Sequence, residues 1–476
     1  MSQVRTSFLN MSWLMVSQII TSICAFIWTI LIARYLGVND YGILGFAISI
    51  TGIFAITVDM GISTHIVRKI SINQNIASKY LGNAIPLKSF FSLITFFILL
   101  LILIFLKFDE LTIIVTLLFT IEMFFKSMAG LFNGSFQAVE EGKYQAIGNI
   151  ILNIILLIFI LISIFCNFGL IGIALAYLFS NFIVMIYLYI KIKTNVTIPE
   201  YELDKDFCIK LTKVSLPFAF YTLFHTIYYS IDITMLTILV GEYASGLYNA
   251  SYKLINVLTL FYTIYTAVIF PVMSKFYKNN ESLLNITFEK SMKYLLAITV
   301  PIAVVTSIYA KDLILLVYGS QYILASSVLS ILIWTVCLLF INGAASILLN
   351  ASYKEVAVTK IYAIAAIFNV IANLILIPMY QANGAAVATV LSDILIFILA
   401  FYVLRKTGYA PRKSLLKDLF KIILGSIILG LVLYFLNLSL FVGLIIGVII
   451  YLIALLLLKI IDDDDMYIIK EILGKN

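Results

Sequence analysis

Long hydrophobic runs separated by short polar turns extend along almost the whole chain. A helix needs about 20 apolar residues to cross the hydrocarbon of a bilayer. Runs of that length predict about fourteen spans, at residues 10–33, 42–64, 83–106, 111–136, 146–166, 169–190, 214–240, 246–274, 292–310, 325–349, 357–378, 383–404, 418–437 and 439–460. The pattern therefore predicts an all-α polytopic membrane protein.

Composition agrees with lipid as the solvent. The chain is 63% hydrophobic and 12% charged, whereas soluble domains are about 45–50% apolar and about 25% charged. The first apolar run extends from Arg5 to Ala33. It is too long for the core of a signal peptide, and many spans follow it, so we expect it to be a retained first helix.

Neither the net charge nor the cysteines predict a nucleic-acid partner, a disulfide frame or a metal site. The charge of +7 comes from basic residues in short loops, where membrane orientation signals belong. The four cysteines form no CxxC pair, and three of them lie inside apolar runs, as expected of packing residues.

The basic residues predict the orientation of the spans. When the spans are threaded alternately, nearly all Lys and Arg residues fall on the side of the N-terminus, and Lys88 is counted among them. The opposite side holds only Arg34, Lys107 and Lys311. Because positive loops stay inside, both termini are expected to be cytoplasmic.

Short motifs recur in the same order in the two halves of the chain, at offsets between 204 and 220 residues. The pairs are 37–43 with 241–247, 133–136 with 350–353, Asn149 and Asn153 with Asn369 and Asn373, and 172–181 with 384–393. Each match alone is weak, but the matches follow the same order in both halves, which supports an internal duplication.

The repeat predicts two six-helix lobes with the same orientation, related by an axis along the membrane normal. We expect an N-lobe at 1–190 (spans 1–6), a basic cytoplasmic linker at 191–213 and a C-lobe at 214–404 (spans 7–12). Residues 405–476 then hold spans 13–14 and an acidic cytoplasmic tail. Two such lobes around a cavity suit alternating access.

The repeat elements also carry a family resemblance. The segments are 31–44, 59–62 followed by Arg68, 231–248, and 373–380 followed by 384–388. They resemble Wzx-type polysaccharide and O-antigen flippases of the multidrug/oligosaccharidyl-lipid/polysaccharide (MOP) exporter superfamily. The family commonly has twelve spans, and fourteen is similar to the lipid II flippase branch.

The resemblance implies a flippase that moves an undecaprenyl-pyrophosphate-linked oligosaccharide across the bacterial inner (plasma) membrane, for O-antigen of lipopolysaccharide or for capsule. Its implied partners are the lipid-linked oligosaccharide, the bilayer, a polysaccharide polymerase and a chain-length regulator, with no nucleic acid. It implies no enzyme activity and no cofactor, with a proton or sodium ion as the candidate coupling ion. The sequence has no GxxxxGK[ST] motif for nucleotide binding.

Charges inside spans are candidate functional residues, because each costs at least about 2.5–3.5 kcal/mol on insertion scales. Glu122 and Lys126 lie four residues apart on one face of the fourth span. Two interpretations are open. Either the pair neutralises itself and only packs the lobe, or Lys126 binds the lipid pyrophosphate while Glu122 sets its charge state.

Three further charges and one histidine lie within the second half. Asp232 and Lys253 fall at similar depth on adjacent spans, which favours a salt bridge; alternatively, Lys253 binds substrate and Asp232 positions it. Asp393 lies near mid-span and is a candidate for proton or cation coupling. His225 is a second coupling candidate, although a lone helical His is more often a neutral hydrogen-bonding residue.

The remaining candidates lie near span ends. Asp59 is a coupling or charge-pair candidate in the cytoplasmic third of span 2. Arg68 follows it, either as a snorkelling anchor or as a group that captures the pyrophosphate. Arg34 either receives the head group at the outer side or pins its loop to Asp40.

Two other functions compete with the flippase. A multidrug or toxin cation antiporter of the same superfamily needs an acidic cavity, and span 1 contains no Asp or Glu. A membrane-embedded glycosyltransferase needs catalytic groups on large outer loops, and the outer loops here are short. The basic residues in or next to the spans favour an anionic substrate instead.

Overall fold

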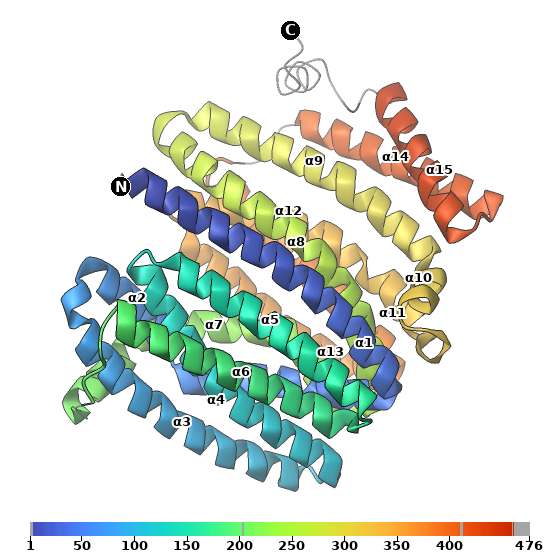
Figure 1. The fold of residues 1–476 in the computed structure, drawn as a ribbon. Coiled ribbons are helices and arrows are strands. Elements are labelled where there is room, and N and C mark those ends of the chain that lie inside the picture. Colours follow the sequence, from blue (N-terminus) through green and yellow to red (C-terminus); the bar gives the residue numbers. More distant parts are fainter. Residues whose placement is uncertain (1–2, 202–203, 410–412, 459, 461–476) are drawn as a thin grey trace. The chain divides into compact units, whose positions relative to one another are not determined.

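The computed structural model describes residues 3–201, 204–409, 413–458 and 460 (Figure 1). The first half of this part contains α1 (Gln3–Asp59), α2 (Ile62–Ile72), η1 (Gln74–Ile76), α3 (Ala77–Phe105), α4 (Glu110–Ala138), α5 (Gly142–Phe165), α6 (Gly169–Asn195) and α7 (Lys205–Leu239). The second half contains α8 (Glu242–Asn279), α9 (Glu281–Ile308), α10 (Ala310–Val317), η2 (Ser320–Tyr322), α11 (Ala325–Leu332), α12 (Trp334–Ala351), α13 (Glu355–Lys406), α14 (Lys413–Leu436) and α15 (Leu440–Leu457).

The helices confirm the all-α, multi-span prediction. Over the described residues, 11 helices are long and apolar enough to cross a membrane, and a bent pair within α7 brings the number to 12. Two of these segments, of 48 and 52 residues, are long enough to cross twice. They contain breaks at Gly37 (φ 76°) and Gln381 (φ 51°), which divide α1 and α13 into two spans each. The expected total of about fourteen crossings follows.

The chain forms two compact units, residues 1–249 and 250–476. In the first unit, α7 packs against α1, α2 and α3. The boundary between the units lies inside α8, beyond the linker that the repeat predicts. The two lobes that the repeat predicts, joined by a linker at 191–213, therefore do not coincide with the two compact units and remain a prediction.

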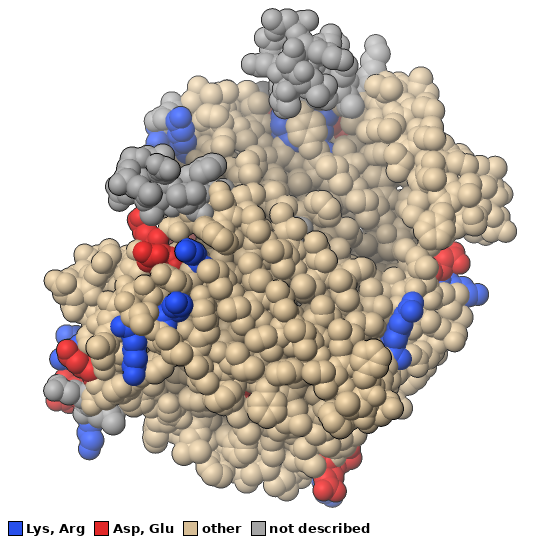
Figure 2. Space-filling view, viewed as in Figure 1, with Lys and Arg blue, Asp and Glu red and all other residues tan. Residues whose placement is uncertain are grey.

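The first unit is held together by apolar side chains on α2, α3, α4 and α6. Ile62, Leu81, Phe132 and Leu188 belong to one buried cluster that joins these helices. In this unit α4 packs on α6, and α5 packs on both α1 and α6. Figure 2 shows charged side chains near the helix ends and an uncharged face over α5 and α6 between them. This is the surface that lipid requires.

The segment between α6 and α7 is bonded to the start of α3. The Glu200 amide donates to the Ser78 carbonyl at 3.3 Å, and the Asp204 amide donates to Asn83 Oδ1 at 3.0 Å. The Asp204 carboxylate then caps α7 by accepting from the Phe207 amide at 3.0 Å. This cap holds the pKa of Asp204 below its ordinary value. As a result α7 begins beside α3.

The turns 37–43 and 241–247, which the repeat pairs, pack against each other inside the first unit. A Cβ added at Gly42 would lie 1.9 Å from the Glu242 carbonyl oxygen, and one at Gly246 would lie 2.0 Å from the Val38 carbonyl oxygen. Gly246 and Glu242 occupy the repeat positions of Gly42 and Val38. The two contacts are therefore reciprocal, as expected where duplicated turns meet about a two-fold axis.

We expect Gly42→Ala and Gly246→Ala to destabilise the protein to a similar extent, by about 1–3 kcal/mol each, because either methyl group would overlap a backbone carbonyl. Thermal unfolding of the purified protein in detergent measures the effect. The matched control is Gly52→Ala on α1, where an added Cβ meets no atom within 4 Å. A Tm of Gly42→Ala equal to that of the control would contradict the reciprocal contact.

Candidate functional site

A cavity of about 330 Å³ lies inside the first unit. Its wall comes from three long helices and the short α2. The lining residues are Ile48, Thr51, Gly52, Ala55 and Asp59 of α1, Ser63 of α2, Phe119, Glu122, Met123, Lys126, Ser127 and Gly130 of α4, and Tyr177 of α6. Three of the candidates from the sequence, Asp59, Glu122 and Lys126, are therefore brought together.

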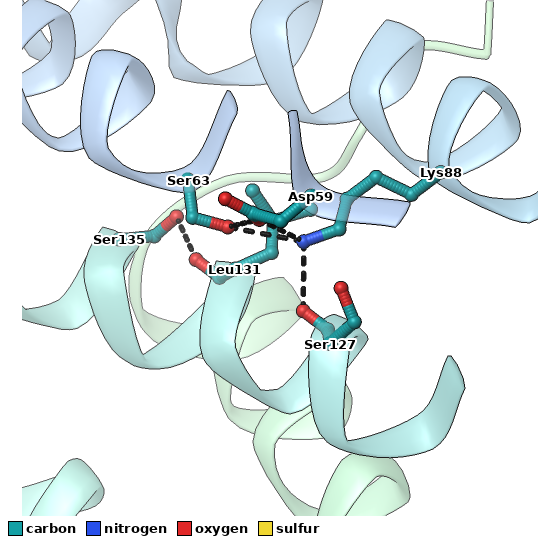
Figure 3. Close-up of polar contacts among 6 residues, drawn as sticks. All are labelled: Asp59, Ser63, Lys88, Ser127, Leu131 and Ser135. Atoms are coloured by element: carbon teal, nitrogen blue, oxygen red, sulfur yellow. Dashed lines mark hydrogen bonds and ion pairs between the residues drawn. The ribbon is translucent and has the colours of Figure 1, made fainter. Parts of the chain in front are cut away.

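Asp59 is held at the cavity by Lys88 (Figure 3). The Lys88 ammonium donates to Asp59 Oδ1 at 2.7 Å, to Ser63 Oγ at 3.0 Å and to the Ser127 carbonyl at 2.8 Å. All three hydrogens of the ammonium thus have acceptors. The Lys88 side chain is 0% exposed, whereas that of Asp59 is 31% exposed. The ion pair joins α1 to α3, and the other two bonds extend it to α2 and α4.

The position of Lys88 corrects one part of the sequence interpretation. Lys88 was counted as a loop residue that marks orientation, but it lies inside α3 and is fully buried. Its partner Asp59 is the last residue of α1, just before a break at Met60 and Gly61, where φ is 46° and 74°. The break lets α2 start in a new direction, so that Ser63 reaches the same ammonium.

Glu122 is buried, and its carboxylate accepts a hydrogen bond from Asn181 Nδ2 at 2.7 Å. Asn181 also donates to the carbonyl of Tyr177 one turn back on α6. Lys126 follows Glu122 by one turn of α4 and is exposed on the cavity wall. Asn181 on α6 thus holds the Glu122 carboxylate in place, while the Lys126 ammonium is accessible from the cavity.

Aromatic rings form another part of the wall. Phe119 and Tyr177 contact each other with ring centroids 5.3 Å apart. Trp28 of α1 packs edge-on against Tyr177 at 5.6 Å. Such contacts hold a ring in a defined orientation. The sequence interpretation did not single out these aromatic residues or Asn181.

Asp232 is buried and accepts a hydrogen bond on Oδ2 from the Tyr248 hydroxyl at 2.7 Å. Tyr248 is therefore a partner that sequence reasoning missed. Lys253, the expected salt-bridge partner, is half-buried on α8 and belongs to the second unit. The pairing of Asp232 with Lys253 remains a prediction.

The other candidates are distributed over several helices. Arg34 on α1 and Arg68 on α2 are exposed, and neither lines the cavity described above. His225 lies on α7, and its side chain is outside the part that the structure describes. Asp393 is buried on α13, where its backbone carbonyl accepts from Asn342 at 2.9 Å.

The repeated asparagines occupy similar local settings. Asn153 Nδ2 donates to the Asn149 carbonyl at 3.0 Å on α5, and Asn373 Nδ2 donates to Asn369 Oδ1 at 3.0 Å on α13. Each bond spans one helical turn within its own unit. In the described residues, no group of three or more His, Cys, Asp or Glu side chains is placed to hold a metal ion.

We expect Asp59→Asn to destabilise the protein more than Lys88→Met. Without Asp59 the fully buried ammonium loses its counter-charge, a change that costs about 3–5 kcal/mol. Without Lys88 the partly exposed carboxylate keeps access to water, so the loss should be smaller. Thermal unfolding of both variants and of the double variant measures the coupling. A larger loss for Lys88→Met, or strict additivity in the double variant, would contradict the assignment.

Two family models match the chain. The model described as polysaccharide biosynthesis protein matches residues 8–277, which is more than half of the sequence. The model described as lipid II flippase MurJ matches residues 210–456. Together the two models extend over nearly all the described helices.

Two curated relatives are similar over part of their length. An uncharacterized membrane protein of Methanocaldococcus jannaschii is 28% identical over 235 residues, 48% of this chain and 45% of the relative. The probable low-salt glycan biosynthesis flippase Agl15 of Haloferax volcanii is 25% identical over 162 residues, 34% of each chain. The chain thus spans less than half the length of these relatives.

Solved structures share the fold. Lipid II flippase MurJ in an inward closed conformation aligns with a TM-score of 0.72 at 18% identity, over 93% of this chain and 97% of that chain. A multidrug resistance MATE family transporter of the MOP superfamily aligns with a TM-score of 0.66 at 14% identity, over 82% and 95%. These structures share the fold, and the family model over residues 8–277 shows that the chain belongs to the polysaccharide biosynthesis family of multi-pass membrane proteins.

Proposed function

We propose that this protein is a flippase that moves a lipid-linked oligosaccharide across the membrane by alternating access. The observation that carries the proposal is a cavity with three charged side chains in its wall, Asp59, Glu122 and Lys126, inside a helical unit of a polysaccharide biosynthesis family member. A cavity with charged walls in a membrane bundle marks a path for a polar substrate. The similarity to MurJ and to Agl15 supports the same function.

The finer proposal names the carrier, the product and the membrane. We take undecaprenyl pyrophosphate as the carrier lipid, O-antigen or capsule as the product, and the inner membrane of a bacterium, with both termini cytoplasmic, as the location. The finer proposal also includes coupling of transport to a proton or sodium ion, and contact with a polysaccharide polymerase and a chain-length regulator.

Within the proposal, Lys126 binds a phosphate oxygen of the substrate. It is the exposed cation on the cavity wall, and an ammonium is a compact point charge that suits phosphate. Lys88 is not available for this role, because its three hydrogens are already bound. Arg34, Arg68 and Lys253 are kept as phosphate contacts at other stages of transport, with Asp232, Asp393 and His225 as coupling candidates.

A cation antiporter is the second candidate, and the cavity gives it one specific argument. Asp59 and Glu122 both line the wall, so the cavity contains the carboxylates that a cation exporter needs. Asp59 is neutralised by Lys88, however, and Lys126 stands one turn from Glu122. The carboxylates are thus balanced by ammonium groups, which favours the flippase.

Deletion of the gene should cause lipid-linked oligosaccharide to accumulate on the cytoplasmic leaflet, and the intact gene should restore its distribution. Leaflet location is measured by the access of a membrane-impermeant glycan label in sealed, oriented vesicles. An unchanged distribution together with reduced efflux of cationic dyes would replace the flippase with the antiporter.

Lys126→Gln should lower the rate of transport by about 10- to 100-fold, the range expected when a hydrogen bond to a charged group is lost. The rate is measured with lipid-linked oligosaccharide in proteoliposomes that contain equal amounts of protein. Lys143→Gln, at an exposed position on α5, is the matched control. Transport by Lys126→Gln at the rate of this control would remove Lys126 from the site.

A further inference from the structure

Several polar atoms on the cavity wall lack partners among the described residues. On Asp59, the hydrogen bonds from the Lys88 and Ser63 side chains both end at Oδ1. Glu122 accepts from Asn181 on Oε1 only. The hydroxyl of Ser127 is buried without any partner. Buried polar groups in folded proteins nearly always have partners, so this wall is complementary to a ligand with hydroxyl groups.

The arrangement of these atoms suits a carbohydrate. Carboxylate oxygens accept hydrogen bonds from hydroxyls, and the Ser127 hydroxyl both donates and accepts. Tyr177 places an aromatic ring on the same wall, held by its contact with the buried Phe119, and the C–H face of a pyranose packs against such a ring. A sugar ring presents the complementary groups: hydroxyls that donate and accept hydrogen bonds, and an apolar face of C–H groups.

Charge and size exclude the rest of the substrate from the interior of the cavity. A pyrophosphate beside the buried Glu122 would lie against its carboxylate, and Lys88 is already bound by its three acceptors, whereas Lys126 is an exposed cation on the same wall. The volume of about 330 Å³ is at the lower end of the range for small-molecule pockets. It accommodates part of a glycan and not a complete lipid-linked oligosaccharide.

We propose that the part of this cavity beside Glu122 and Ser127 is a sugar-binding subsite, which receives a neutral ring of the glycan while the pyrophosphate stays at the exposed Lys126 on the same wall. The inference rests on the proposed function, because it assigns one part of the flippase substrate to one part of the protein. Glu122 and Asp59 accept hydrogen bonds from the ring hydroxyls. Tyr177 packs against its apolar face. The subsite thus selects the glycan, and the phosphate contact is common to all substrates with this carrier.

The test compares two probes on the full-length protein in nanodiscs. One is the lipid-linked oligosaccharide extracted from the source cells, and the other is the bare polyprenyl pyrophosphate that remains after the glycan is cleaved off. Glu122→Gln should weaken binding of the glycosylated lipid by about 10- to 100-fold and leave binding of the bare lipid unchanged. Glu110→Gln, the same substitution at an exposed position on α4, should change neither affinity.

Tyr177→Leu and Ser127→Ala provide independent tests, since the first removes the aromatic ring and the second removes the unpartnered hydroxyl. Both should weaken binding of the glycosylated lipid only. An equal loss for both probes would place the pyrophosphate beside Glu122 and Ser127 and overturn the sugar subsite. No loss for either probe in all three variants would remove the ligand from these residues and overturn it as well. If the wild-type protein binds neither probe and its deletion leaves the leaflet distribution unchanged, the proposed function itself fails.

Discussion

A bilayer supplies no water to a charged group, and this constraint determines how the first unit is built. Lys88 lies in the interior with its three hydrogens bound by Asp59, Ser63 and Ser127. These acceptors come from three other helices, so satisfying one ammonium also fixes the mutual positions of α1, α2, α3 and α4. The remaining polar groups of the cavity, including Glu122, are placed on the framework that results.

The cavity combines two kinds of polar group with different roles. Lys88 and one oxygen of Asp59 are fully engaged with each other and contribute to structure. The second oxygen of Glu122 and the Ser127 hydroxyl have no hydrogen-bond partner in the described part of the chain. A site of this kind keeps its shape when empty and still offers hydrogen bonds to a ligand, which is the usual form of a preorganised binding site.

Hydrophobic periodicity was enough to predict the helices and the number of crossings, because both depend on the local sequence. The family was predicted from the resemblance of short motifs. The contacts of the site were harder to predict. Asp59 and Lys88 lie equally far inside their expected spans, so the depth argument used for Asp232 and Lys253 would have paired them. Lys88 was instead assigned to a loop. Asn181 and Tyr248 carry no charge, and the direction in which they face depends on how whole helices pack.

The reciprocal packing of Gly42 and Gly246 has a consequence for motion. The turns 37–43 and 241–247 form both contacts, Gly42 with the Glu242 carbonyl and Gly246 with the Val38 carbonyl. The internal repeat relates one contact to the other. Between them, Gly45 lies against Asn249, and these two residues also occupy matching repeat positions. A rigid displacement that separates one glycine from its carbonyl separates the other at the same time. The duplication thus makes the two contacts interdependent, so that neither is lost alone.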